Sequence, residues 1–177
     1  MNNIRQHLSI TNFTILITLL MYLVQINIEY GTAKMGLNSL FLEYDLWYQP
    51  LSTMFAHGGE LHLLMNMFVL FQFGNMIEKF RGKVYFILLY FVGGVLTSLG
   101  SFYFMQYFGM NHNLVGASGA ICVLMGYVAL IDQSQRKGIT TWIVLISLAP
   151  LLIGLPIAWY AHFIGFAIGF AIGLIRR

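Results

Sequence analysis

Long apolar segments constrain this chain more than any other feature of its sequence. Six can be marked, at approximately 10–28, 61–77, 84–105, 117–131, 140–156 and 160–175. About 20 apolar residues in a helix cross the roughly 30 Å hydrocarbon core of a bilayer, and only 8% of the residues are charged. An isolated strand would leave its backbone unpaired in lipid. The expected fold class is therefore an all-α integral membrane protein with six transmembrane helices, forming one domain over residues 1–177.

The positive charges predict the orientation of these helices. With six crossings, one side of the membrane carries Arg5, Lys79, Arg81, Lys83, Arg136, Lys137, Arg176 and Arg177, and the other side carries only Lys34. Because basic residues concentrate in cytoplasmic loops, both termini are predicted to be cytoplasmic. The first apolar segment has no small-residue cleavage site, so we expect a retained helix rather than a signal peptide. The connection at 29–60, which contains Trp47, is expected to lie partly inserted in the membrane interface.

Composition and spacing also limit the function. The net charge of +3 does not come from a basic patch with stacking aromatics, so no nucleic-acid partner is expected. Cys122 is the single cysteine, which excludes an intramolecular disulfide. His57, His62 and His112 raise the possibility of a metal site, but no His-Glu-x-x-His pattern is present. We therefore expect no metal or other cofactor.

Four polar residues fall deep within the predicted helices, where polar groups are costly and therefore suggest a site. They are His62 and Asn66 in the second segment, Ser118 in the fourth and His162 in the sixth. These three helices enter from the same side and carry the residues in their first turns, so the four side chains are predicted to share one depth. The fourth helix is short, and the polar segment at 107–113 before it predicts a re-entrant loop and a water-accessible Ser118.

Small residues predict close contact between the fourth and sixth helices. Gly165, Gly169 and Gly173 repeat at four-residue spacing on the face that carries His162, and residues 116–120 around Ser118 are all small. Close packing would let the imidazole accept the serine proton, so we predict a catalytic Ser118–His162 dyad without a carboxylate. On one face of the second helix, residues 62 and 66 are expected to stabilise an oxyanion together with the Ser118 amide.

Each of these residues also has a structural interpretation. A serine among small residues is most often helix packing, and a buried asparagine can join helices. A transporter that uses His162 as a proton relay is a further alternative, although no internal repeat is visible. Pro150 and Pro156 are expected to loosen the fifth helix and its following loop, which would form a gate for lateral substrate entry.

The motifs resemble those of the rhomboid family of intramembrane serine proteases over nearly the whole chain. Residues 116–119 match the family's Gly-x-Ser-Gly, residues 62–66 match its His-x-x-x-Asn, and Ala161-His162 with the following glycines matches its last-helix motif. His57 and Glu78 also fall where the family often has His and Glu. The resemblance implies a protease of the minimal six-helix bacterial type, in the inner (plasma) membrane, that cleaves single-pass transmembrane proteins among membrane lipids. It also implies the oxyanion role of His62 and Asn66.

Two departures from the family pattern are present. Trp47 is followed by Tyr48 where the family commonly has Trp-Arg, which weakens the expected anchoring of the first loop. Cys122 replaces an aromatic residue that stacks on the histidine in many members, and Tyr160 is a candidate to hold His162 instead. An inactive relative that binds client transmembrane helices is the main alternative function. The sequence carries no indication of the oligomeric state.

Overall fold

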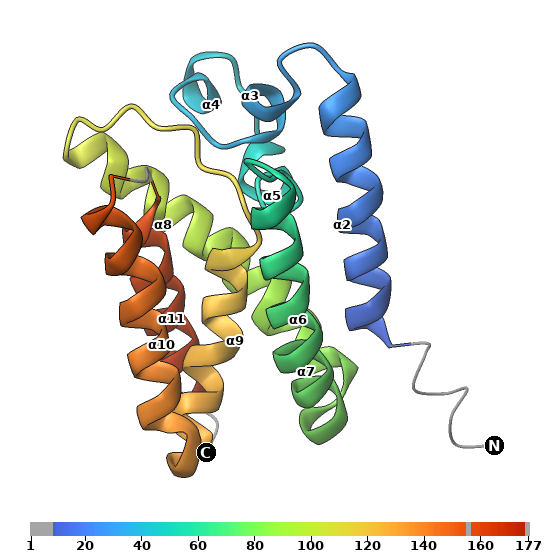
Figure 1. Cartoon of the computed structure of the whole chain (residues 1–177), viewed down its shortest axis with the longest axis vertical. Coiled ribbons are helices and arrows are strands. Elements are labelled where there is room, and N and C mark those ends of the chain that lie inside the picture. Colours follow the sequence, from blue (N-terminus) through green and yellow to red (C-terminus); the bar gives the residue numbers. More distant parts are fainter. Residues whose placement is uncertain (1–8, 155–156, 176–177) are drawn as a thin grey trace.

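The computed structural model describes residues 9–154 and 157–175, and this part of the chain is helical with no strand (Figure 1). The long elements are α2 (Ile10–Asn27), α6 (Glu60–Arg81), α7 (Lys83–Ile87) continued by the π-helical turn η1 (Leu88–Val92) and α8 (Gly93–Tyr107), then α9 (Ser118–Ile131), α10 (Gln133–Leu152) and α11 (Trp159–Ile175). The short ones are α3 (Gly31–Met35), α4 (Leu40–Glu43) and α5 (Gln49–Ser52).

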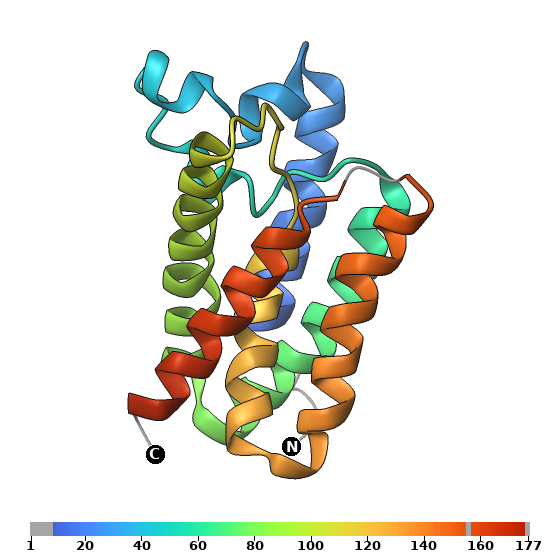
Figure 2. The same ribbon diagram turned by 90° about the vertical axis from the view of Figure 1, so that its left-hand side faces the viewer.

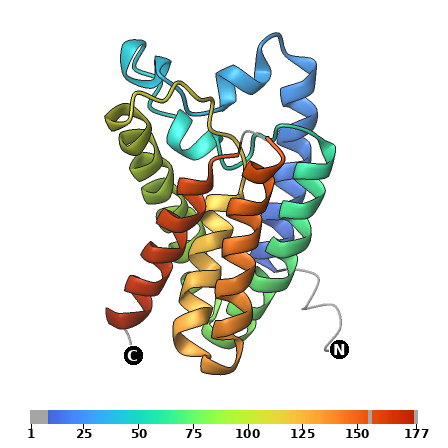
Figure 3. The same cartoon turned by 60° about the vertical axis from the view of Figure 1, so that its left-hand side comes forward.

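Helix α9 lies at the centre of the bundle. Every residue from 120 to 130 is buried, because α6, α8, α10 and α11 all pack around this helix (Figures 2 and 3). Its 14 residues rise only about 21 Å at 1.5 Å per residue. The irregular segment between α8 and α9 fills the remaining depth above it (Figure 1). Ser118, the first residue of α9, therefore lies recessed below that end of the bundle.

Glycines bring α9 and α11 into backbone contact. A Cβ atom added to Gly165 would collide with the carbonyl oxygen of Gly119, and one added to Gly169 would collide with the carbonyl oxygen of Val123. The small-residue spacing thus predicted the correct pair of helices. This contact fixes the position of the first turn of α11 relative to the start of α9.

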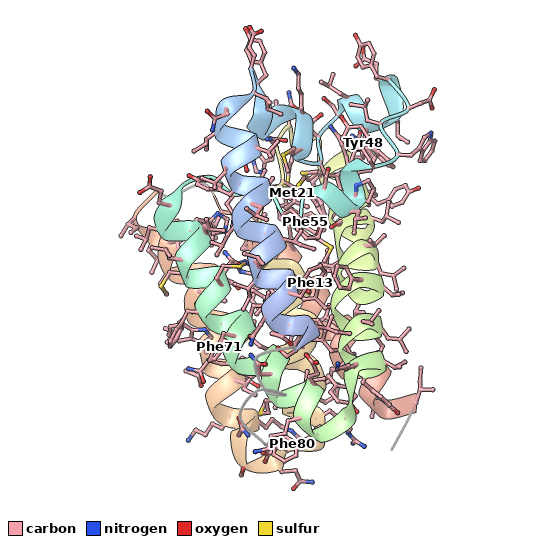
Figure 4. The ribbon with its side chains drawn as sticks, turned by 90° about the vertical axis from the view of Figure 1, so that its right-hand side faces the viewer. Phe13, Met21, Tyr48, Phe55, Phe71 and Phe80 are labelled. Carbon is pink, nitrogen blue, oxygen red and sulfur yellow. The ribbon has the colours of Figure 1, made fainter. Side chains whose placement is uncertain are left out.

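Helix α2 is polar toward the protein and apolar toward the outside. It buries Thr11, Thr14, Thr18 and Gln25 on one face. Apolar side chains occupy the outer surface, where Phe13 on α2 and Phe71 on α6 are 62% and 54% exposed (Figure 4). Such an inverted arrangement is unfavourable in water, but in lipid the polar groups join helices while apolar groups meet the hydrocarbon.

The predicted interfacial loop at 29–60 contains three short helices. They cover one end of the bundle (Figure 1). There Phe41 packs edge-on against Phe102 of α8 and against Trp47. Tyr48, which lies between α4 and α5, is exposed (Figure 4). The loop is thus anchored to α8 by an aromatic cluster, although the Trp-Arg pair of the resemblance is absent.

The helix bounds differ from the sequence expectations mainly at polar ends. Helix α10 begins at Gln133, seven residues before the expected start, because Asp132 caps it by accepting a hydrogen bond from the Ser134 amide. Its described part ends at Leu152, with Pro150 in the last turn, and Pro156 lies outside the described residues. Helix α6 continues four residues beyond the expected 77 as a basic turn. Hydropathy detects the apolar body of a helix and not such polar turns.

Two helices of the described part are both long and apolar enough to span a membrane, namely α2 and the continuous helix Lys83–Tyr107. Helices α9 and α11 are apolar but shorter. Helices α6 and α10 are long, but they carry more polar residues. An all-helical architecture with an apolar exterior agrees with the expected class, whereas six crossings and cytoplasmic termini remain predictions.

Candidate active site

The four polar residues singled out in the sequence line one cavity. Ser118, His162, His62 and Asn66 border a space of about 760 Å³ that residues of α6 and α10 also line. Each residue lies near the N-terminal end of its helix, and α6, α9 and α11 all begin at the same end of the bundle (Figures 1 and 2). The shared depth expected from the helix directions therefore corresponds to a shared site.

Ser118 and His162 lie within hydrogen-bond distance. The Nε2 atom of His162 is 3.1 Å from Oγ of Ser118. Ser118 is partly exposed to the cavity, while His162 is 8% exposed. An imidazole placed in this way can take the hydroxyl proton if Nε2 carries no hydrogen of its own.

The other ring nitrogen of His162 contacts Ser147, a residue without a distinctive sequence motif. Its Nδ1 atom lies 3.1 Å from Oγ of Ser147, which is fully buried on α10. The suggestion that Tyr160 holds His162 was wrong. The Tyr160 ring instead stacks on Phe104 at 4.8 Å between centroids, and its hydroxyl has no hydrogen-bond partner within the described part of the chain.

His62 and Asn66 form one edge of the cavity. The Nδ1 atom of His62 accepts a hydrogen bond from the Gly58 amide at 3.4 Å, so in the neutral ring Nε2 carries the hydrogen. Asn66 donates one amide hydrogen to the His62 carbonyl at 2.7 Å and keeps a second. Both side chains can therefore offer a donor to the cavity.

The segment before Ser118 is held by contacts on both sides. The Gly116 amide donates to the Thr53 carbonyl at 2.9 Å, and Leu114 pairs with Leu37 in an isolated antiparallel bridge. Gly116 adopts a φ of +124°, which disfavours any residue with a Cβ atom. An added Cβ would also lie 2.8 Å from Cε1 of His62. Glycine is required here for backbone conformation and for space.

His57 also contacts the segment that precedes Ser118. Its Nδ1 lies 3.3 Å from the Phe55 carbonyl and donates to it, so Nε2 can accept from the Ala117 amide, which lies at 3.5 Å. Burial, with a smaller contribution from nearby His62, lowers the pKa of His57 from 6.5 to about 4. His57 is therefore neutral near pH 7, as this pair of hydrogen bonds requires.

The first helical turn adds further donors to the site. The amide of Ser118 is in the first turn of α9, where N–H groups have no acceptor within the helix and the helix dipole favours negative charge. Together with His62 and Asn66 it can stabilise an oxyanion that forms near Ser118. No cluster of three or more His, Cys, Asp or Glu side chains suited to a metal occurs among residues 9–154 and 157–175.

Ser147 and the supporting His57 lie outside the first turns of the second, fourth and sixth helices, where the sequence places its most unusual polar residues. Helix α10 runs in the opposite direction, so a residue at the same depth lies near its C-terminal end. Ser147 is the last polar residue before Pro150 in an apolar stretch. That position in the sequence could have identified Ser147 as a candidate site residue.

The fold and the cavity define the class of protein. It is an all-helical bundle with an apolar exterior, and a serine and a histidine are in contact inside it. A family model described as the Rhomboid domain matches residues 44–177. The chain belongs to the rhomboid family, whose members are integral membrane proteins and generally intramembrane proteases.

Several relatives are named as proteases. The chain is 32% identical over 139 residues to the putative rhomboid protease YdcA of Bacillus subtilis, covering 73% of this chain and 67% of that one. It is 26% identical over 140 residues to the rhomboid protease GlpG of Haemophilus influenzae, covering 74% and 70%. The match to the rhomboid protease GluP of Bacillus subtilis is 33% over 100 residues, or 56% of this chain but only 18% of GluP. The names of these relatives support the assignment of this chain to the hydrolases, and among them to the proteases.

Proposed function

We propose that this protein is an intramembrane serine endopeptidase that cleaves single-pass transmembrane proteins with Ser118 as nucleophile and His162 as base. The observation that carries the proposal is the 3.1 Å contact between His162 Nε2 and Ser118 Oγ inside a large cavity. Hydrolysis in a bilayer needs water at a bond that lipid otherwise shields. A cavity lined both by the loop at 111–116 and by residues of α6 and α10 supports access of water and of the substrate to Ser118.

The proposed chemistry follows ordinary acyl transfer. His162 Nε2 takes the Ser118 proton as Oγ attacks the carbonyl carbon of the scissile bond, and the carbonyl oxygen becomes an oxyanion. The Ser118 amide, His62 and Asn66 donate hydrogen bonds to that oxyanion. The imidazolium then protonates the leaving amine as the C–N bond breaks and an acyl-enzyme forms. His162 then takes a proton from water as the water attacks the ester carbonyl, and the imidazolium returns that proton to Oγ of Ser118 as the C–Oγ bond breaks, which releases the acid product and restores the enzyme.

The substrate is proposed to enter sideways between α6 and α10. Val69 of α6 and Trp142 of α10 border the main cavity and also a second one of about 390 Å³ farther along the same two helices. The opening between these helices is thus lined along much of its length by apolar side chains, which suits a transmembrane segment.

The setting proposed for this reaction is a bacterial inner (plasma) membrane, with residues 1–177 as one six-helix domain and both termini cytoplasmic. The basic residues of the α6–α7 and α9–α10 corners support this orientation, because they lie at the end of the bundle opposite Ser118 (Figure 1). Membrane lipids and single-pass proteins are the proposed partners.

The decisive experiment is cleavage of a model single-pass substrate in liposomes. Wild type is expected to cleave it, whereas Ser118→Ala and His162→Ala lower kcat at least about 1,000-fold. A fluorophosphonate should label wild type and not Ser118→Ala. If wild type binds the substrate but shows neither cleavage nor labelling, the protein is an inactive rhomboid-like binder of client helices, and the proposal is wrong.

A further inference from the structure

The geometry points to Ser147 of α10 as a positioning residue for the base His162. This inference rests on the proposed function, since it concerns the same serine and histidine. Ser147 Oγ lies 3.1 Å from His162 Nδ1, and His162 Nε2 lies 3.1 Å from Ser118 Oγ. The three side chains form one chain of hydrogen bonds that joins α9, α11 and α10.

The chemistry of the base requires one tautomer of His162. To accept the Ser118 proton, Nε2 must carry a lone pair, so in the neutral ring Nδ1 carries the hydrogen. A group that accepts a hydrogen bond at Nδ1 stabilises this form. The hydroxyl of Ser147 can accept that bond, and it is fully buried, so water does not compete for it.

Within the described part of the chain, Ser147 is the one side chain other than Ser118 that hydrogen-bonds to His162. Among residues 9–154 and 157–175 no carboxylate borders the cavity, and Cys122 occupies the position at which many family members have an aromatic ring. Its side chain is too small to stack across an imidazole face. Ring orientation in this chain therefore depends on contacts at its two nitrogens, of which the contact with Ser147 is the one that does not involve the nucleophile.

A neutral hydroxyl also suits the depth of the site. A carboxylate at this position would remain a buried charge throughout each catalytic cycle, which is costly at membrane depth. Ser147 orients the ring without adding charge. When His162 becomes an imidazolium, the same hydroxyl still accepts from Nδ1, and that bond is stronger because the donor is then charged.

The test uses two substitutions of equal volume. Thr and Val differ only in whether a hydroxyl or a methyl is present, and both are β-branched. We expect Ser147→Val to lower kcat about 5- to 10-fold, the effect of losing one neutral hydrogen bond, with KM changed less than about twofold. Ser147→Thr should recover at least half of the wild-type kcat, since crowding by the added methyl affects both variants equally.

A spectroscopic measurement separates orientation from general disturbance. In protein labelled with ¹⁵N-histidine, the His162 signals, assigned with His162→Gln, should show a protonated Nδ1 and an unprotonated Nε2 in wild type and Ser147→Thr. In Ser147→Val the population with a protonated Nε2 should rise. Ser101→Ala, which removes another fully buried hydroxyl from α8, is the matched control and should leave both kcat and tautomer unchanged.

The outcomes distinguish this inference from the proposed function. If Ser147→Val matches Ser147→Thr in kcat and in tautomer, while Ser118→Ala is inactive, Ser147 does not position the base but the protease proposal stands. If Ser118→Ala cleaves as well as wild type, the proposed function itself fails. A Ser147→Val variant with less than about half of the wild-type folded yield would be assessed from the fluorophosphonate labelling rate per folded molecule, where the same 5- to 10-fold loss is expected.

Discussion

Gly116 combines a positive φ with contact to the active-site cavity. Replacement by alanine would strain the backbone by about 1–3 kcal/mol and press a methyl group against the His62 ring. We predict that Gly116→Ala lowers the rate of substrate cleavage at least about 10-fold, because it displaces a donor from the oxyanion position. The measurement is kcat in liposomes, together with the melting temperature in detergent.

Gly109 supplies the matched control. It too has a positive φ, +62°, but nothing lies within 4 Å of an added Cβ atom. Gly109→Ala should lower stability, although less than Gly116→Ala because it adds no clash, and leave cleavage unchanged within about twofold. Equal losses of activity in both variants would show that strain, rather than displacement of His62, is responsible.

His57 predicts a loss of stability in acid. Its folded pKa of about 4 lies below the ordinary 6.5, so between these values the unfolded chain binds more protons than the folded one. Stability is therefore constant above about pH 6.5, falls as the pH drops from 6.5 to 4 and levels off below 4. The pKa difference corresponds to roughly 3 kcal/mol at most.

Unfolding in detergent at pH 7 and at pH 4.5 tests this effect. Wild type should lose more stability between the two values than His57→Gln, which cannot titrate but is less stable at pH 7. His112→Gln changes an exposed histidine at the same end of the molecule and is the control. The same pH dependence in wild type and His57→Gln would mean that other groups cause the acid sensitivity.

At the residue scale, the candidate site was predictable where rare polar residues interrupt apolar helices. Ser118, His162, His62 and Asn66 were identified in this way, and they line one cavity. Ser147 was not identified, because a serine in the middle of a segment has no distinctive spacing until the direction and register of its helix are known. Its contact with His162 depends on how α10 packs against α11.

At the level of elements, the start of α2 depends on a residue from another helix. Glu78 of α6 accepts hydrogen bonds of 2.9 Å from the amides of Ile10 and Thr11 and from the Thr11 hydroxyl. A carboxylate at a helix N-terminus also interacts favourably with the helix dipole. We predict that Glu78→Ala lowers the free energy of unfolding by about 2 kcal/mol, measured by denaturation in micelles, whereas Glu43→Ala on exposed α4 changes little.

Lateral entry of the substrate between α6 and α10 predicts that cross-linking these two helices blocks cleavage. Cysteines at Val69 and Trp142 in a Cys122→Ala background, joined by a short bifunctional maleimide, should reduce cleavage of the transmembrane substrate at least about 10-fold. Fluorophosphonate labelling of Ser118 should remain within about twofold, because the small reagent can enter from the end of the bundle. Full cleavage by the cross-linked protein would contradict lateral entry, and the single-cysteine variants are the controls.

The bodies of the long helices were predictable from hydropathy, because the apolar segments correspond to the parts of α2, α6, α8, α9 and α11 that the structure describes. The helix ends that consist of polar residues were not predictable from hydropathy. Residues 133–139 continue α10 toward the basic corner through a capping aspartate, and α3, α4 and α5 form in a segment without helical periodicity. These short helices depend on tertiary contacts such as Phe41 with Phe102.

For the whole molecule, the charge distribution predicts which side faces the cytoplasm. Lys34 of α3 and Lys137 of α10 are exposed. Helix α3 and the start of α10 lie at opposite ends of the bundle (Figure 1). In a Cys122→Ala background, Lys137→Cys should react with an impermeant maleimide only in inverted membrane vesicles, and Lys34→Cys only in intact spheroplasts. The reverse labelling pattern would place Ser118 at the cytoplasmic side and overturn the proposed orientation. Labelling of both cysteines in one preparation would contradict the odd number of crossings, three, that is expected between them.

Of the properties of the whole molecule, the number of membrane crossings is the one that hydropathy predicts least well. Helices α6 and α10 carry polar side chains along their length, and α9 is too short to span lipid by itself. Helix α10 buries only Ile139, Ile143 and Ser147 of its 20 residues, and polar residues lower the hydropathy of both α6 and α10, so length and hydropathy alone single out α2 and Lys83–Tyr107 as possible spans. The family motifs predict the fold without relying on hydropathy, because they consist of side chains that lie together in the folded protein.

The backbone contact between α9 and α11 has a consequence for how the enzyme responds to its membrane. Side-chain interfaces can compress or slide when bilayer thickness changes, whereas main-chain atoms at the Gly119–Gly165 and Val123–Gly169 contacts are already at their closest approach. We therefore expect the spacing of Ser118 and His162 to change little with the host lipid. Any sensitivity of the proposed activity to lipid composition should arise at the proposed substrate entrance instead.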